Sequence, residues 1–266
     1  MSMSFFTVQH LQAGYGKKTI LSDISFSLEE GRIVGVLGAN GCGKTTLLKC
    51  LCGILPHGGE CTLLGERLEH RSAKQIARVC SYIPQRSGIS IEISALDMTL
   101  MGFNPRLRLL EHPTEEMKRR AEEALSLVGL GQRQADPYLA LSEGQKQLCI
   151  LARTLVSDAN LLLLDEPESA LDFRFRYRIP AILRDWVSQG SRGVIVTLHD
   201  SAFALTYCDE LLLRSDGRVL GSVRPKTDPL EETEAMLSKI YGSISLHACL
   251  GRDGRRHIAM IKEEDT

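Results

Sequence analysis

The sequence predicts an α/β fold: a mostly parallel sheet, an antiparallel β subdomain ahead of it, and a helical subdomain inserted into it. Three observations lead to this prediction. Strand-like and helix-like segments alternate along much of the chain, an order typical of parallel sheets. Residues 33–37 and 161–164 are nearly continuous apolar runs, as expected of strands buried on both faces. Residues 86–158, in contrast, have a helical pattern.

The first part of the chain is expected to form short strands with turns between them, then a glycine-rich turn and a helix. The helix is predicted at residues 44–51, and the strands at residues 6–11, 20–28, 33–37, 60–64 and 79–83.

The middle of the chain is predicted to be helical because Met117, Ala121, Leu125 and Val128 recur at spacings of four, four and three. Strands at residues 161–164, 193–198 and 210–213 then continue the sheet. The tail holds a helix at 230–240 and strands at 244–250 and 257–261. The expected units are residues 1–85 and 159–225 for the core with its β subdomain, 86–158 for the helical subdomain, and 226–266 for the tail.

The composition is that of an ordinary soluble globular protein. The 266 residues include 32 Lys and Arg against 33 Asp and Glu, for a formal net charge of −1, and 43% are hydrophobic. This balance of charges produces no overall electrostatic field that would attract nucleic acid or acidic lipid, so no nucleic-acid partner is expected. No stretch without Asp, Glu, Lys or Arg reaches the length of about 20 residues that a membrane helix needs. No secretory signal is recognisable either, so the cytosol is the expected compartment.

Aromatic and basic residues alternate at residues 173–178, Phe-Arg-Phe-Arg-Tyr-Arg. The period of two fits a strand, and such a ribbon could stack bases and bind phosphates. Because six residues are a short sample and the overall charge is near neutral, we favour a helix that begins here with its arginines solvated.

Residues 38–45, Gly-Ala-Asn-Gly-Cys-Gly-Lys-Thr, match the pattern G-x-x-x-x-G-K-[ST] at every position, between a predicted buried strand and a helix. The glycines let backbone N–H groups point at phosphate oxygens, while the helix adds its positive N-terminal end. Lys44 is expected to reach the β and γ phosphates, and the Thr45 hydroxyl to bind Mg²⁺. The sequence therefore predicts a P-loop NTPase core that binds a nucleoside triphosphate with Mg²⁺.

A second part of the site is predicted where the apolar run at 161–164 ends in Asp165 and Glu166. Asp165 would hold Mg²⁺ through water, and Glu166 would be the base that polarises the attacking water. Adjacent carboxylates at a strand end are also common as solvated loop residues, but the complete P-loop favours the functional interpretation.

Residues 141–145 read Leu-Ser-Glu-Gly-Gln, and Ser142 with Gln145 has the form of a capping box at the start of a helix. A capped helix N-terminus is an anion site. The stretch resembles LSGGQ, the signature of the nucleotide-binding subunits of ATP-binding cassette (ABC) transporters. Further features of that family occur in its order: Tyr15 before the P-loop, Gln85 after it, Asp-Glu-Pro at 165–167, and His199.

The resemblance implies roles for these residues. Tyr15 would stack on adenine, Gln85 would contact Mg²⁺ and the attacking water, and His199 would contact the γ-phosphate. In the family two subunits pack head to tail, and each ATP lies between the P-loop of one and the signature of the other. The implied ATP-binding residues are Tyr15, Gly38, Asn40, Gly41, Cys42, Gly43, Lys44, Thr45 and Thr46, with Ser142, Gly144, Gln145 and Asp172 across the dimer. The implied catalytic residues are Glu166, His199, Lys44 and Gln85, and the implied metal ligands are Thr45, Gln85 and Asp165.

Residues 98–105 and 237–242 look like those of the ATPases of iron-siderophore, haem and cobalamin importers. This resemblance implies an ATP hydrolase that serves two separate permease subunits and, indirectly, a substrate-binding protein, at the cytoplasmic face of the inner membrane. An importer ATPase for zinc, manganese or molybdate, and a soluble ABC ATPase of iron-sulfur cluster assembly, are the open alternatives.

Three positions depart from the family pattern: Glu143 in the signature, Cys42 in the P-loop, and Glu168 where threonine is usual. We expect Glu143 to face away from phosphate and Cys42 to make ATP binding sensitive to thiol reagents. The histidines other than His199 are given no role. The cysteines form no C-x-x-C pair, which argues against zinc ribbons and thioredoxin chemistry, and most are expected to be small buried apolar residues.

Overall fold

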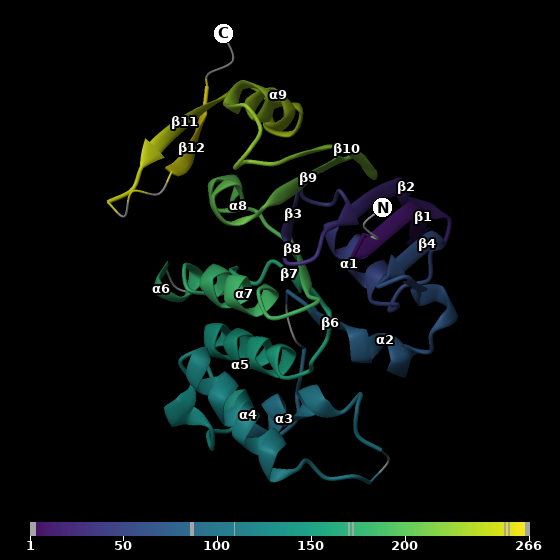
Figure 1. Cartoon of the computed structure of the whole chain (residues 1–266), viewed down its shortest axis with the longest axis vertical. Coiled ribbons are helices and arrows are strands. Elements are labelled where there is room, and N and C mark those ends of the chain that lie inside the picture. The colour runs from purple at the N-terminus through teal and green to yellow at the C-terminus, as the bar shows by residue number, and fades with distance from the viewer. Residues whose placement is uncertain are drawn as a thin grey trace.

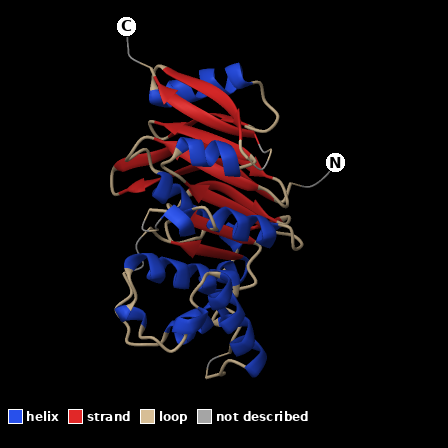
Figure 2. Ribbon diagram, turned by 90° about the vertical axis from the view of Figure 1, so that its left-hand side faces the viewer, coloured by secondary structure: helices blue, strands red, loops and turns tan. Residues whose placement is uncertain are grey.

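The computed structural model describes residues 4–85, 88–108, 110–169, 171, 173–252, 254 and 256–263. A central sheet has helices on one side, and a further helix with an antiparallel sheet on the other (Figure 1). A helical part lies at one end of the molecule, and a C-terminal helix and hairpin lie at the opposite end; Figure 2 shows the strands stacked above the helical part.

Within the described ranges, the central sheet has the strand order β10-β9-β3-β8-β7-β6. Its strands are β3 (Ile33–Gly38), β6 (Cys80–Ile83), β7 (Leu161–Asp165), β8 (Gly193–Thr197), β9 (Glu210–Ser215) and β10 (Arg218–Val223). All neighbours pair in parallel except β10, which pairs antiparallel with β9. The predicted α/β class with a mostly parallel sheet is confirmed.

The apolar runs of the sequence reflect burial of this sheet on both faces. In β3, Ile33 and Leu37 belong to a core shared with α5 (Glu143–Leu155), α7 (Ile179–Val187) and α8 (Ser201–Tyr207). Val34 and Val36 belong to a second core shared with α1 (Lys44–Leu51) and the antiparallel sheet. A strand between two cores cannot alternate apolar with polar residues, which is why its sequence reads as a continuous apolar run.

The antiparallel sheet has the order β2-β1-β4-β5 and is followed by α2 (Ala73–Val79). Its strands are β1 (Phe6–Tyr15), β2 (Lys18–Leu28), β4 (Gly58–Leu63) and β5 (Glu66–Arg67). β1 is longer than expected because it pairs with β2 up to the turn, where Tyr15 faces Lys18. The sequence did not predict β5, which has two exposed residues and therefore no apolar pattern. The strand expected from residue 79 begins at Cys80 because Val79 ends α2.

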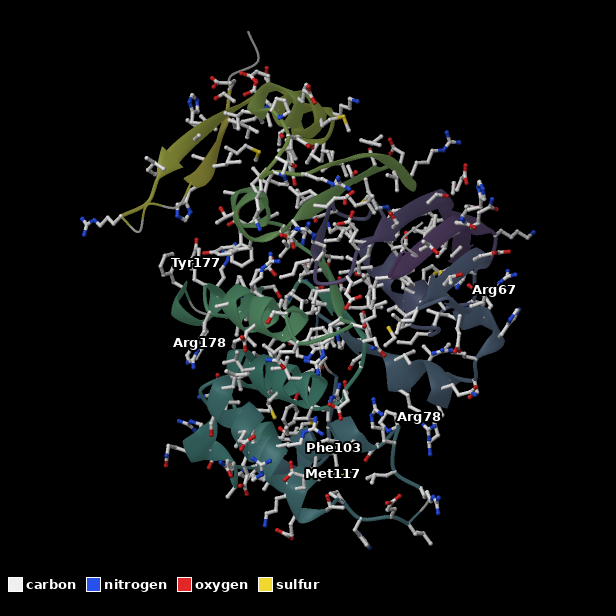
Figure 3. The ribbon with its side chains drawn as sticks, viewed as in Figure 1. Arg67, Arg78, Phe103, Met117, Tyr177 and Arg178 are labelled. Carbon is white, nitrogen blue, oxygen red and sulfur yellow. The ribbon has the colours of Figure 1, made fainter. Side chains whose placement is uncertain are left out.

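The helical part contains α3 (Ala95–Leu100), α4 (Glu115–Leu127) and α5, which pack on one another. The predicted stripe on α4 is confirmed: Ala121, Leu125 and Val128 are buried, and Met117 is partly buried against the same core. Figure 3 shows Met117 within this part, together with the buried side chain of Phe103.

The aromatic-basic segment at 173–178 begins a helix, as favoured from the sequence, so the alternative interpretation as a β-strand is wrong. It forms α6 (Phe173–Arg176) and leads into α7. The ring of Tyr177 packs against Phe173 and Phe203, with centroids 4.8 and 5.7 Å away. Arg176 is not simply solvated, because it pairs with Asp200 at 2.6 Å. Figure 3 shows Tyr177 and Arg178 at the outer edge of the molecule.

The tail consists of α9 (Leu230–Tyr241), β11 (Ile244–Leu250) and β12 (Arg256–Lys262), close to the predicted bounds. The hairpin packs against α8 through β12. Among the residues that the structure describes, no helix is both long and apolar enough to cross a membrane.

Candidate active site

The phosphate-binding loop leaves β3 at Gly38 and ends at the start of α1. A Cβ atom at Gly38 would lie 2.5 Å from the carbonyl oxygen of Arg214 on the adjacent strand, so only glycine fits there. Gly41 and Gly43 have φ values of 79° and 92°, in the left-handed region that favours glycine. The loop can therefore curl in front of α1 and place its N–H groups around an anion.

Lys44 is buried at the first position of α1, and its Nζ donates a hydrogen bond to the Gly38 carbonyl at 2.8 Å. The ammonium group therefore lies over the loop. An open cavity of about 280 Å³ lies against the loop; its lining residues include Asn40, Gly41 and Cys42. Thr45 is partly buried and Thr46 is buried on the same helix.

Asp165, at the carboxyl end of β7, is 1% exposed. The Thr197 hydroxyl donates to its Oδ1 at 2.7 Å, and the Tyr82 hydroxyl donates to its Oδ2 at 3.3 Å. Burial raises the pKa of Tyr82, so the phenol remains a donor. Sequence reasoning missed both partners. Thr197 was detectable as the polar residue that ends an apolar strand, since it faces Asp165 in the register of β7 and β8.

Three predicted catalytic residues meet at Glu166. This residue adopts φ 50°, and its backbone N–H donates to the Thr197 hydroxyl at 3.0 Å. Gln85 Nε2 donates to Glu166 Oε2 at 2.6 Å, and His199 Nε2 lies 2.5 Å from Oε1. Each carboxylate oxygen thus contacts a side chain that follows a different strand, Gln85 after β6 and His199 after β8, and these contacts hold the carboxylate in place.

The three residues expected to hold Mg²⁺, Thr45, Gln85 and Asp165, would bind the ion through oxygen atoms. Mg²⁺ binds hard oxygen ligands and usually retains several waters. Asp165 provides a carboxylate held by two neutral hydroxyl donors, while Thr45 provides a hydroxyl and Gln85 an amide oxygen. An Mg²⁺ site of this kind needs no nitrogen or sulfur ligand.

The signature residues begin α5. Ser142 Oγ accepts the Gln145 N–H at 3.3 Å, and Gln145 Oε1 accepts the Ser142 N–H at 3.0 Å, which completes the predicted capping box. Gly144 lies in the first turn. Glu143 is exposed and pairs with Lys146 at 2.9 Å along the helix. α5 packs on α3, α4 and β6, whereas α1 packs on β1, β2, β3 and β7, so the two helix N-termini belong to different parts of the chain.

The remaining predicted residues are more dispersed. Tyr15 ends β1 and is half exposed, as a side chain available for stacking must be. Asp172 lies outside the described residues. Glu168 is buried, and burial raises its pKa; within the described part of the chain its Oε2 has no hydrogen-bond partner.

Comparison with known proteins identifies relatives among import ATP-binding proteins. The chain is 33% identical over 209 residues to a cobalamin import ATP-binding protein of Halobacterium salinarum, covering 78% of this chain and 52% of that protein. The chain therefore spans about half the length of this relative. A hemin import ATP-binding protein of Bordetella avium is 34% identical over 88% of this chain and 90% of that protein. A phosphonates import ATP-binding protein of Stutzerimonas stutzeri is 34% identical over 80% of this chain and 82% of that protein.

The fold has solved neighbours of the same kind. A chain of an inward-facing ABC transporter described as metal-chelate type superposes with a TM-score of 0.80 at 24% identity, over 98% of both chains. The profile of the family described as ABC transporter matches residues 21–169, from β2 to the segment after Glu166. The chain thus belongs to the ABC transporter family, as a member of its ATP-binding component.

Proposed function

We propose that this chain is the ATP-hydrolysing subunit of an ABC importer, which couples ATP binding and hydrolysis to uptake of a metal chelate of the iron-siderophore, haem or cobalamin type. The observation that carries the ATPase assignment is the meeting of Gln85 and His199 at Glu166, beside buried Asp165. β3 and β7 are parallel strands of one sheet, so the P-loop and these carboxylates lie at the same edge of it.

The reaction proposed for this site is in-line hydrolysis of the γ-phosphate. A water oxygen forms a bond to the γ-phosphorus while the bond to the β–γ bridging oxygen breaks, which yields ADP and phosphate. Glu166 accepts the proton of that water, and Gln85 and His199 hold the carboxylate and the water in line. Lys44 and the N-terminus of α1 stabilise the negative charge on the β and γ phosphates. Mg²⁺, when bound with ATP by Thr45, Asp165 and Gln85, would neutralise phosphate charge.

The site is proposed to be completed by a second copy of the chain. Ser142, Gly144 and Gln145 lie at the start of α5, which packs in the helical part rather than against α1. Head-to-tail packing would bring this helix end, together with Asp172, to the ATP held by the P-loop of the partner. ATP would then close the dimer, and phosphate release would reopen it.

The proposed membrane partners are two permease subunits, with a substrate-binding protein acting through them, at the cytoplasmic face of the inner membrane. The hemin import ATP-binding protein matches this chain over most of the length of both, which supports a metal chelate as the cargo. The phosphonates import relative is also 34% identical to this chain, so an importer of a metal or an oxyanion is the second candidate. A soluble ATPase of iron-sulfur cluster assembly is a third; it would purify with soluble scaffold proteins rather than a permease.

Reconstitution tests this proposal. The full-length chain is co-purified in detergent with its permease, reconstituted in proteoliposomes, and assayed for ATP-dependent uptake of haem, cobalamin and a ferric siderophore, with a phosphonate and molybdate for comparison. We expect transport of one chelate, which stops when the chain carries Glu166→Gln. ATP-driven uptake of molybdate or phosphonate alone would reject the chelate assignment, and the absence of any permease from the complex would reject the importer.

A further inference from the structure

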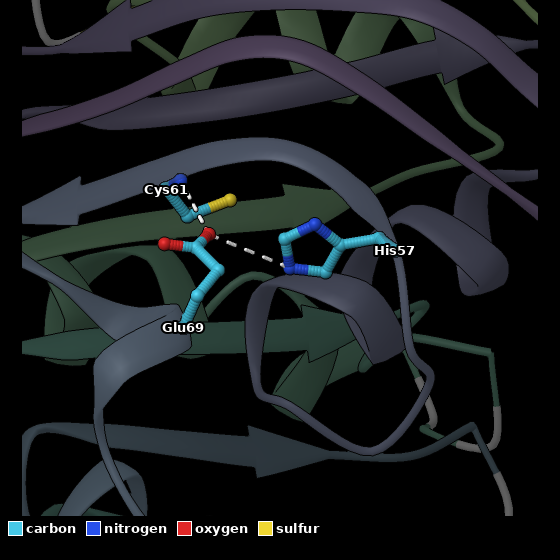
Figure 4. A group of neighbouring side chains, drawn as sticks. All are labelled: His57, Cys61 and Glu69. Carbon is cyan, nitrogen blue, oxygen red and sulfur yellow. Dashed lines mark hydrogen bonds and ion pairs between the residues drawn. The ribbon is translucent and has the colours of Figure 1, made fainter.

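Three side chains of different chemistry converge in the antiparallel sheet, around β4 and the turn that precedes α2. His57 directly precedes β4, Cys61 lies on β4, and Glu69 lies in the 3₁₀ turn Leu68–His70. One nitrogen, the sulfur and one carboxylate oxygen all lie within 4.8 Å of one another (Figure 4). None of these residues belongs to the ATP site described above.

The histidine ring has one nitrogen, Nε2, near the Glu69 carboxylate. Nδ1 of His57 lies 3.1 Å from the Gly58 carbonyl oxygen, which can only accept a hydrogen bond, so Nδ1 carries the proton. In the neutral ring Nε2 is then an acceptor, and it lies 3.8 Å from Glu69 Oε1. A cation bound between these two atoms would contact both of them. A histidine whose second nitrogen donates to a backbone carbonyl is also the usual arrangement of a metal ligand.

Burial and a backbone hydrogen bond hold the three candidate ligand side chains in place. The backbone N–H of Cys61 donates to Glu69 Oε1 at 2.6 Å, which ties the carboxylate to β4. Cys61 is 0% exposed, and the side chains of His57 and Glu69 are 8% and 23% exposed. Burial, with the Glu69 charge beside it, raises the pKa of the Cys61 thiol.

We propose that His57, Cys61 and Glu69 form a site for a divalent transition-metal ion of the zinc class. Imidazole nitrogen, thiolate sulfur and carboxylate oxygen are the three ligand types of Zn²⁺, and a water would take the fourth, tetrahedral position. Mg²⁺ and Ca²⁺, which take oxygen ligands, do not fit this set. Binding replaces the proton of the Cys61 thiol by the metal–sulfur bond and releases that proton to solvent. The ion would fasten β4 to the turn that follows it.

The sequence concealed this site because its spacing, H-x3-C-x7-E, matches no familiar zinc pattern. From the sequence, His57 was given no role, and most cysteines were expected to be buried apolar residues. The antiparallel pairing of β4 with β5 and the turn after it bring Glu69 back to Cys61, and only the folded chain shows this.

The test uses the untagged full-length chain, stripped with a chelator and free of ATP and Mg²⁺. Zinc affinity is measured by competition with a chromogenic chelator, and Co²⁺ is used as a spectroscopic probe, because a cobalt–thiolate bond gives a charge-transfer band in the near ultraviolet. Cys61→Ser and His57→Ala remove single ligands. Cys249→Ser is the matched control, since it removes an exposed thiol on β11.

We expect one zinc ion per chain and a thiolate band with Co²⁺. Cys61→Ser should abolish the band, and each ligand variant should lower zinc affinity by about tenfold or more. Cys249→Ser should change neither. Zinc should raise the melting temperature of the wild-type chain but not of Cys61→Ser. Absence of zinc binding, or unchanged binding and band in Cys61→Ser, would overturn the proposal and leave a simple ion pair between His57 and Glu69.

Glu69→Gln serves as a second variant if Cys61→Ser does not fold. Glutamine keeps an oxygen that can accept the Cys61 N–H but has no negative charge. It should therefore fold and still bind zinc at least about tenfold more weakly. Unchanged zinc affinity in this variant would also overturn the site. Because none of these readouts involves ATP, failure here says nothing about the proposed ATPase, and failure of the ATPase says nothing about the metal.

Discussion

Replacing Glu166 with glutamine tests the proposed catalytic base. In the wild-type chain the carboxylate oxygens contact Gln85 at 2.6 Å and His199 at 2.5 Å, with the side chain nearly buried. Glutamine has the same shape, and its amide can still accept from one neighbour and donate to the other. The fold and the P-loop should therefore be unchanged, while the variant can no longer accept a proton from water.

The size of the effect follows from that single loss. A positioned general base contributes roughly 10²- to 10⁴-fold to a rate, which corresponds to about 2.7–5.4 kcal/mol of barrier at about 1.36 kcal/mol per tenfold. We expect the steady-state turnover of Glu166→Gln to fall by at least about 10²-fold, with ATP affinity equal to or tighter than that of the wild-type chain.

The assay is phosphate release at saturating ATP and Mg²⁺, with ATP affinity measured separately by equilibrium titration. Glu123→Gln is the matched control, because it makes the same substitution on the exposed face of α4, where Glu123 pairs with Arg119. It should leave turnover unchanged. Turnover of Glu166→Gln within about threefold of the wild-type rate, an effect too small for a lost general base, would refute the role given to this carboxylate.

Three further predictions concern binding and stability. Lys44→Ala should weaken ATP binding by about tenfold or more, since it removes a charged donor to phosphate; isothermal titration showing an unchanged Kd would contradict the P-loop assignment. Asp209→Asn should lower the free energy of unfolding by about 2 kcal/mol in urea titrations, because the buried carboxylate accepts from Arg184 and Lys226 at 2.7 and 2.8 Å. Burial alone would raise the pKa of Asp209, but these partners outweigh it and hold the pKa below 3.8. The stabilisation is thus present above pH 3.8 and is lost as the pH falls through the lower folded value; an Asp209→Asn chain as stable as the wild type at pH 7 would refute this. Glu168→Gln should raise the melting temperature at pH 7, because burial lifts the pKa of Glu168 above 4.5 and its ionised form costs stability. That gain should disappear below pH 4.5, and a lower melting temperature at pH 7 would contradict it.

The sequence predicted those features whose cause is local in the chain. β3 and β7 were identifiable because burial on both faces requires an unbroken apolar run, and α1 starts where Gly43 ends the P-loop. The capping box at Ser142 was equally readable, since both of its hydrogen bonds join residues three apart.

What the sequence did not reveal depends on contacts between distant segments. Thr197 supports Asp165 across 32 positions, and Tyr82 reaches the same carboxylate across 83. Likewise Asp209 accepts the Ile33 N–H from 176 residues away. No spacing rule links such pairs, because strand order and register bring them together. β5, with two exposed residues, has no side-chain pattern to detect.

The ATP-dependent mass of the Glu166→Gln chain tests the central claim, that two copies form the complete site. Light scattering on a sizing column is measured with saturating ATP, with ADP and without nucleotide. We expect twice the 29.4 kDa of the single chain with ATP, and 29.4 kDa in the other two conditions. Adding Lys44→Ala should keep the chain at 29.4 kDa in ATP. A single-chain mass for Glu166→Gln at saturating ATP, with nucleotide demonstrably bound, would contradict the shared site.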